Sequence, residues 1–305
     1  MKHLFVFGLG FSASAAAAQL RRSGWQVSGT VRSPAKCEAL ERQGFAPLLF
    51  GDADGVRRAL DSATHCLVSA PPREAGDPVL AAYGEAMRTA PGLRWLGYLS
   101  TIGVYGELDG AWADEDTPAE PDTERGAVRI EAEAAWTAFC ARRGLPLDIF
   151  RLAGIYGPGR NPLERIRRGE AHRIVKPGQV FNRIHVDDIA QAMVAAVLQE
   201  RTQPGTRLFN LADDEPAPPQ DVILYAAELI SAPPPPEVPF EQAVLSPMAR
   251  SFYAGNKRIR NDKIKRELGI VLKYPTYREG LRALLENEAG SPSNVERLGD
   301  GGSSG

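Results

Sequence analysis

The glycines near the start of this chain constrain its fold more than any other feature. An apolar run over His3–Phe7 leads into Gly8-Leu9-Gly10-Phe11-Ser12-Ala13, an alanine-rich stretch follows to Arg22, and a second apolar run ends at Arg32. The order of strand, glycine turn, helix and strand is that of a βαβ unit. Gly8 permits the tight turn, Gly10 lets the backbone approach a phosphate at the helix N-terminus, and Ala13 permits close packing of helix against strand. This stretch predicts a dinucleotide-binding unit with Gly8, Gly10, Phe11, Ser12 and Ala13 at the cofactor; the alternative is a βαβ unit whose turn binds nothing.

The end of the second strand indicates which dinucleotide is bound. An NAD-binding unit carries Asp or Glu about 20 residues after the glycines, on the ribose 2′-hydroxyl. Here Thr30 takes that place and Arg32 follows it. Without the carboxylate a 2′-phosphate is not repelled, and a guanidinium can bind it in fork geometry. NADP is therefore expected rather than NAD, unless Arg32 is only a solvated residue at the start of a helix.

Strands and helices continue to alternate as far as Arg151. Such alternation predicts an α/β fold, a Rossmann-type doubly wound parallel sheet. The further strands are expected over 47–50, 65–69, 95–100, 147–151 and 207–210, with helices over 35–43, 56–60, 78–89, 123–143 and 188–199, and a loop over 107–121.

The predicted organisation is a Rossmann core that takes in two stretches of chain, with a smaller C-terminal region. Residues 1–156 and 187–210 form the core in this scheme, and 157–186 and 211–288 cover the substrate. The last residues, 289–305, are polar and glycine-rich, which is typical of a disordered tail. Helices are expected over 222–230, 262–268 and 277–286, with a stiff proline loop at 233–236.

Composition excludes several classes of partner. The net charge is −2, which implies neither nucleic acid nor a membrane surface as a partner. No apolar run reaches the ~18 residues of a transmembrane helix. Cys37, Cys66 and Cys140 lie far apart and read as thiols of a reducing cytoplasm. The chain is expected to be a cytoplasmic monomer or homodimer that binds a small-molecule substrate and no metal.

Several motifs in a fixed order point to a known family. They are Gly8–Ala13, Gly51-Asp52, Ser69-Ala70-Pro71-Pro72, Ser100–Gly106, Arg151–Gly159 and Ile184–Asp188. Together they resemble the extended and atypical short-chain dehydrogenase/reductases, the NAD(P)-dependent epimerase/dehydratase-like proteins, over about residues 1–285.

The resemblance implies roles for individual residues. Asp52 would accept a hydrogen bond from the adenine amino group, unless it is only a turn residue. Ala70 and Pro71 would face the ribose and pyrophosphate, and Tyr156 and Pro158 would lie under the nicotinamide. Thr101 matches the active-site Ser/Thr whose hydroxyl holds a substrate oxygen; the alternative is a strand-end hydroxyl bonded to backbone.

The resemblance breaks at the catalytic pair. The family carries Tyr-x-x-x-Lys on the long helix, where the Tyr moves the proton and the Lys holds the ribose. This sequence has Arg125 and Arg129 there, and an Arg cannot relay a proton. Tyr105 or Tyr156 could supply the phenol, with Tyr105 taken as the candidate acid beside Thr101. The two Arg residues could clamp an anionic substrate, or Arg129 could hold the ribose or pair with Glu133.

A second departure concerns the substrate. Nucleotide-sugar epimerases place an Arg four residues before the motif His; here that position is Phe181, with Arg183 two residues further and His185 as the His. A nucleotide sugar is therefore not the expected substrate. The sequence favours an NADP-dependent oxidoreductase or epimerase/dehydratase-like enzyme acting on a small polar metabolite. The alternative is a non-catalytic NADP-binding sensor, which the missing pair favours.

Overall fold

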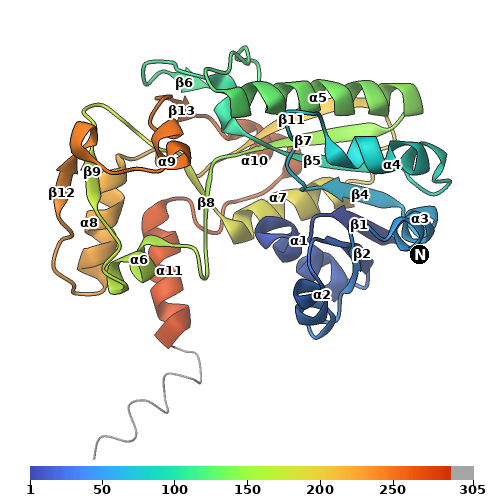
Figure 1. The fold of residues 1–305 in the computed structure, drawn as a ribbon, viewed down its shortest axis with the longest axis horizontal. Coiled ribbons are helices and arrows are strands. Elements are labelled where there is room, and N and C mark those ends of the chain that lie inside the picture. The colour runs from blue at the N-terminus through green and yellow to red at the C-terminus, as the bar shows by residue number, and fades with distance from the viewer. Residues whose placement is uncertain (290–305) are drawn as a thin grey trace, which may run out of the picture.

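A seven-stranded parallel sheet forms the centre of the computed structural model, which describes residues 1–289. Its order is β11-β7-β5-β4-β1-β2-β3, so the chain starts in the middle and runs outward in both directions (Figure 1). This is the doubly wound arrangement, and the predicted Rossmann-type α/β class is confirmed. The strands of this sheet are β1 (His3–Phe7), β2 (Gln26–Val31), β3 (Ala46–Leu49), β4 (His65–Val68), β5 (Trp95–Thr101), β7 (Pro146–Leu152) and β11 (Gly205–Leu211).

Helices cover both faces of the sheet, and the side-chain alternation of β1 shows how. Leu4 and Val6 pack with the helices α1 and α7, while Phe5 and Phe7 pack on the opposite face with α3, α4 and α5. Both faces of β1 are apolar because both are covered, as expected for a parallel sheet. The helices of this core are α1 (Phe11–Arg22), α2 (Pro34–Glu41), α3 (Ala53–Ser62), α4 (Pro78–Thr89), α5 (Glu124–Arg143) and α7 (Val186–Leu198).

Most predicted boundaries shift by a few residues in the structure, and two differences have a clear cause. The first helix, expected from Ser14, begins at Phe11, directly after Gly10, because the glycine serves as its N-cap. The segment expected as a loop over 107–121 contains the short strand β6 (Trp112–Ala113), which pairs with β13 (Arg258–Ile259). That pairing joins residues far apart in the sequence, so no local pattern could have predicted it.

The C-terminal elements build a second, smaller core beside the sheet. Tyr156, Leu163, Val222, Tyr277 and Leu281 meet in it. Of the tail expected over 289–305, only Ala289, the last residue of α11, belongs to the described residues. No helix within residues 1–289 is both long and apolar enough to cross a bilayer. The remaining elements are η1 (Ile102–Tyr105), β8 (Gly154–Tyr156), α6 (Pro162–Arg167), β9 (Arg173–Val175), β10 (Arg183–His185), α8 (Pro219–Leu229), β12 (Glu237–Pro239), η2 (Phe240–Gln242), α9 (Pro247–Ser251), α10 (Asp262–Leu268) and α11 (Tyr277–Ala289).

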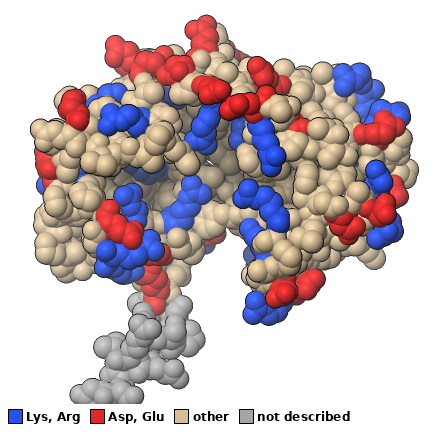
Figure 2. Space-filling view, viewed as in Figure 1, with Lys and Arg blue, Asp and Glu red and all other residues tan. Residues whose placement is uncertain are grey.

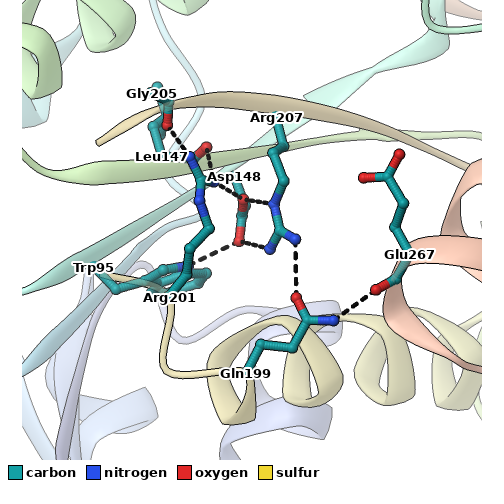
Figure 3. Close-up of polar contacts among 8 residues, drawn as sticks. All are labelled: Trp95, Leu147, Asp148, Gln199, Arg201, Gly205, Arg207 and Glu267. Carbon is teal, nitrogen blue, oxygen red and sulfur yellow. Dashed lines mark hydrogen bonds and ion pairs between the residues drawn. The ribbon is translucent and has the colours of Figure 1, made fainter. Parts of the chain in front are cut away.

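The buried carboxylate of Asp148 connects the amino ends of β5, β7 and β11, at the edge of the sheet opposite the glycine turn. Asp148 on β7 is fully buried and accepts hydrogen bonds from the Trp95 indole at 2.8 Å, from Arg201 at 2.9 Å and from Arg207 at 2.8 and 2.9 Å (Figure 3). Ligands of this fold class bind at the carboxyl ends of the strands. The Asp148 cluster therefore serves stability.

Candidate functional site

Thr30, on the neighbouring strand β2, holds the glycine turn after β1 by hydrogen bonds. Gly8 has a φ of +90° and donates its N–H to the Thr30 hydroxyl at 3.0 Å, and the Leu9 N–H bonds to the Thr30 carbonyl at 2.9 Å. Thr30 is 1% exposed. Its side chain therefore fixes the conformation of the turn. The sequence had led us to expect a direct contact between Thr30 and the cofactor. A Cβ at Gly8 would lie 3.1 Å from the Ala70 nitrogen, so the turn abuts the loop after β4.

The N-terminus of α1 presents an open cradle. Gly10 is the N-cap, and no side chain among the described residues caps this helix end. A Cβ at Gly10 would have only the Gly8 carbonyl within 4 Å, at 3.8 Å, so the space above it is free. The backbone N–H groups of Phe11, Ser12 and Ala13, which start the helix, lack helical partners and favour an anion. The cradle fits a pyrophosphate.

A pocket of about 570 Å³ opens beyond the carboxyl ends of β2 and β3. Arg32 and Asp52, predicted separately from the sequence, both line it. Asp52 also caps α3, because its Oδ1 accepts the Gly55 N–H at 3.0 Å. A carboxylate has further lone pairs, so the cap and a contact with an adenine amino group are compatible. The other lining residues are Pro34, Leu49, Phe50 and Gly51.

The loop after β8 meets the start of α1. A Cβ at Gly157 would lie 3.2 Å from the Phe11 ring, so this loop and the glycine turn are neighbours, and the adjoining Pro158 is exposed. Pro71, next to Ala70, is exposed as well. The Tyr156 hydroxyl, in contrast, is buried against α11, where a Cβ at Gly280 would overlap it. Burial raises the pKa of Tyr156, so its phenol packs in the smaller core and faces away from the cradle.

The two residues expected to be catalytic have different surroundings. Thr101 ends β5, is partly exposed, and accepts the Gly103 N–H at 3.1 Å, which leaves its own O–H free to donate. Tyr105 is 0% exposed and donates its hydroxyl to Asn210 at 2.8 Å, while the Arg151 guanidinium lies 4.8 Å from its ring. Burial raises the pKa of Tyr105. A phenol so enclosed does not fit the expected role of proton donor, whereas Thr101 remains a candidate.

The two arginines in place of the catalytic pair differ, since only Arg129 is hydrogen-bonded to other residues within 1–289. Arg129 donates to the Leu99 carbonyl at 2.7 Å and to the Tyr98 hydroxyl at 3.2 Å, and Arg125 is exposed one turn earlier. The expected ion pair between Arg129 and Glu133 does not form. Glu133 is buried with Arg151 at 2.7 Å instead, because β7 places that guanidinium beneath α5. Arg129 thus joins α5 to the end of β5.

Three residues considered for the substrate lie on or beside β10. The Arg183 guanidinium donates to the carbonyls of Phe181 at 3.0 Å and Ala217 at 3.2 Å, and burial lowers its pKa. His185 accepts the Asp187 N–H on Nδ1 at 3.1 Å, and burial lowers its pKa to about 4. His185 is therefore a neutral, structural residue that caps α7.

Sequence reasoning missed two features near the site. Ser100 and Arg151, both inside quoted motifs, share the Glu133 carboxylate and tie β5, β7 and α5 together. Lys257 is buried and donates to the Gly106 carbonyl just beyond η1. The contacts of Glu133 could have been suspected, because each of two core strands carries a polar residue. The contact of Lys257 could not, because Lys257 and Gly106 are 151 residues apart.

One face of the molecule has a central hollow. Figure 2 shows Lys and Arg side chains on both sides of a central hollow, and the same view in Figure 1 places α6 and α11 on one side and α1 and α2 on the other. The chain as a whole has a net charge of −2. Cations gathered at a hollow in a slightly acidic protein attract anionic ligands.

Comparisons with known proteins show the family of this chain. Residues 4–212 match the model of the NAD dependent epimerase/dehydratase family. Protein YeeZ of Escherichia coli K12 is 29% identical over 290 residues, which cover 90% of this chain and 97% of YeeZ. A conserved protein of unknown function from Silicibacter pomeroyi has a solved structure that is 50% identical, with a TM-score of 0.86, over 95% of this chain and all of that one.

A more distant structure shares the fold. The UDP-glucose 4-epimerase of Thermotoga maritima, solved with UDP-glucose, is 20% identical with a TM-score of 0.74, over 94% of this chain and 98% of its own. The glycine turn, the parallel sheet and the family match over residues 4–212 lead to one assignment. This chain belongs to the NAD dependent epimerase/dehydratase family.

Proposed function

We propose that this chain binds NADP and acts as an oxidoreductase or an epimerase/dehydratase-like enzyme on a small polar metabolite. One observation carries the proposal: the free space above Gly10 and the pocket with Arg32 and Asp52 lie along the same carboxyl edge of the sheet. The first fits a pyrophosphate and the second an adenosine with a 2′-phosphate. When bound, the nicotinamide would supply or accept a hydride.

Different residues of the protein would bind different parts of the cofactor and the substrate. The N–H groups at the start of α1 hold the pyrophosphate, Ala70 and Pro71 border it, and Arg32 holds the 2′-phosphate. Thr101, at the end of β5, orients a substrate oxygen through its free O–H. Arg129 fixes the end of β5 from α5, and Tyr156 and Pro158 form the loop that borders the nicotinamide end of the site.

Arg32 is the residue expected to select NADP over NAD. Arg32→Ala removes a charge-assisted bond to the 2′-phosphate, which costs on the order of 1.5–3 kcal/mol, or about 10–100-fold in NADPH affinity. NADH affinity should not change, because NADH lacks that phosphate. Fluorescence titration of both cofactors measures this, and Arg88→Ala, which changes an exposed arginine of α4, is the control. Equal NADPH affinity in Arg32→Ala and the wild type removes Arg32 from the site.

A second candidate function is a sensor that binds NADP without turning it over. The observation that favours it concerns Arg129, which takes the position of the family's Lys. Its guanidinium is already hydrogen-bonded to Leu99 and Tyr98. Assaying NADPH oxidation with a broad panel of aldehydes and ketones separates the two. Turnover of any member establishes the enzyme, whereas tight NADPH binding with no turnover across the panel establishes the sensor.

A further inference from the structure

Arg125 is a cation near the site that has no partner in the protein. It is exposed, and within residues 1–289 its guanidinium has neither a hydrogen bond nor an ion pair, not even with the nearby Asp122 or Glu124. It stands in the first turn of α5, where the helix dipole disfavours a positive charge. Arg129 follows four residues later on the same helix face, and like charges at that spacing repel. A ligand that brings a negative charge would offset both costs.

The packing of α5 along β5 places Arg125 level with Thr101. Arg129 donates to the Leu99 carbonyl at 2.7 Å, which fixes the position of the helix against the strand. From Arg129 back to Arg125 the helix advances about 6 Å toward the carboxyl edge of the sheet. From Leu99 to Thr101 the strand advances about 6.6 Å in the same direction. Both residues therefore stand at the carboxyl edge, one on the helix and one on the strand that it covers.

Contacts through Gly103 connect the start of α5 with the Thr101 hydroxyl. Gly126, the neighbour of Arg125, packs so closely on η1 that a Cβ there would lie 3.0 Å from the Gly103 carbonyl oxygen. The Gly103 N–H in turn donates to the Thr101 hydroxyl oxygen at 3.1 Å. Only Gly103 thus separates the backbone beside Arg125 from that hydroxyl. The long Arg125 side chain and the free Thr101 O–H can therefore bind two groups of one small molecule.

The chemistry of the guanidinium indicates which group Arg125 takes. Its planar fork of N–H donors matches the two oxygens of a carboxylate or a phosphate, and it stays charged at all ordinary pH values. Arg129 cannot serve in the same way, because its guanidinium is already bonded to Leu99 and Tyr98. The Lys and Arg side chains around the central hollow in Figure 2 would attract the same kind of ligand.

We propose that Arg125 binds an anionic group of the substrate, a carboxylate or a phosphate, while Thr101 holds the oxygen at the reacting carbon. The inference rests on the proposed enzymatic function and narrows the small polar metabolite to one that carries such an anion close to a carbonyl or hydroxyl group. Arg125 determines specificity in this account. It takes no part in proton transfer, because a guanidinium keeps its proton.

The first test measures binding and needs no turnover. Lactate and glycerol 3-phosphate each carry a hydroxyl group and an anion, and glycerol is the neutral comparison. Protein saturated with NADPH cannot oxidise them, because the cofactor is already reduced, so calorimetry reports binding alone. At least one anion should bind more tightly than glycerol, and Arg125→Gln should weaken that binding about 10–100-fold.

The control for this test lies on the same helix. Arg142→Gln changes an exposed arginine in the last turn of α5 and should bind the anions as the wild type does. If Arg125→Gln binds both anions as tightly as the wild type, Arg125 is not an anion site. If the wild type binds neither anion more tightly than glycerol, the proposed substrate class is wrong.

The second test uses matched pairs of carbonyl compounds in NADPH oxidation. Pyruvate is compared with methyl pyruvate, and glyceraldehyde 3-phosphate with glyceraldehyde. In the wild type, kcat/KM should favour the charged member of at least one pair by about 10–100-fold, and Arg125→Gln should remove most of this preference. A preference that is absent from the wild type, or that survives in Arg125→Gln, overturns the anion site while leaving the enzyme. Absence of turnover across the panel overturns the enzymatic function, and the calorimetry then decides the role of Arg125 alone.

Discussion

Gly10→Val should abolish NADPH binding while the protein stays folded. The φ of Gly10 is −95°, which any residue adopts, and a Cβ there would have only the Gly8 carbonyl within 4 Å, at 3.8 Å. The valine would therefore occupy the space of the pyrophosphate rather than clash with the chain. Because it also replaces a better N-cap, we expect a stability loss of up to about 1 kcal/mol. NADPH affinity should fall on the order of 100-fold or more, equivalent to about 2.7 kcal/mol.

A matched control separates the cradle from the fold. Gly84→Val makes the same change within α4, where the nearest atom to a new Cβ is a Leu80 methyl at 3.9 Å. Both variants should unfold within a few degrees of the wild type, and only Gly84→Val should keep NADPH-induced stabilisation in a thermal melt. A Gly10→Val protein that NADPH still stabilises as strongly as the wild type would falsify the assignment of the glycine turn.

Asp148→Ala should destabilise the protein by about 3–5 kcal/mol, the usual cost of removing one partner of a buried ion pair. The carboxylate accepts from Trp95, Arg201 and Arg207 at once (Figure 3), and its loss removes the anion beside two half-buried guanidinium groups and the acceptor of a buried indole N–H. Urea unfolding followed by circular dichroism measures the change. NADPH affinity should be kept under native conditions, since the cluster lies at the amino ends of the strands.

Asp54→Ala is the comparison for this variant. Asp54 pairs with Arg57 at 3.4 Å on the surface of α3, with both side chains largely exposed. Exposed pairs contribute between about 0 and 1 kcal/mol. If Asp148→Ala costs no more than Asp54→Ala, the burial of the Asp148 cluster does not stabilise the sheet.

The core of the fold could be predicted from sequence because its signals are local. The apolar run of His3–Phe7, the glycine turn and the alternation up to Arg151 each report on neighbouring residues, and the parallel sheet follows from their order. Arg32 and Asp52 could be placed at one edge of the sheet in the same way, since each stands at a strand end whose position the fold fixes, and both line one pocket. Thr30 was assigned to the right place, yet its orientation toward Gly8 depends on packing that the sequence does not encode locally.

The rest depended on contacts between distant segments. Glu133 was expected to pair with Arg129 one turn away, but Arg151 on β7 is buried beneath it and is the stronger partner in that environment. Tyr105 was expected to be the acid, but its hydroxyl donates to Asn210 on the edge strand β11, 105 residues away in the sequence. The contact of Lys257 with the Gly106 carbonyl likewise joins distant segments, next to the β6–β13 pairing. Helical periodicity and motif spacing carry no information about contacts between residues that are distant in the sequence.

Titration of the wild-type protein with NADPH and with NADH, followed by nicotinamide fluorescence, tests the central claim most directly. The cradle above Gly10 and the pocket that holds Arg32 predict saturable binding of one cofactor per chain, with NADPH about 10–100-fold tighter than NADH. Equal affinities would contradict the choice of NADP. No saturable binding of either cofactor at millimolar concentration would contradict the site itself.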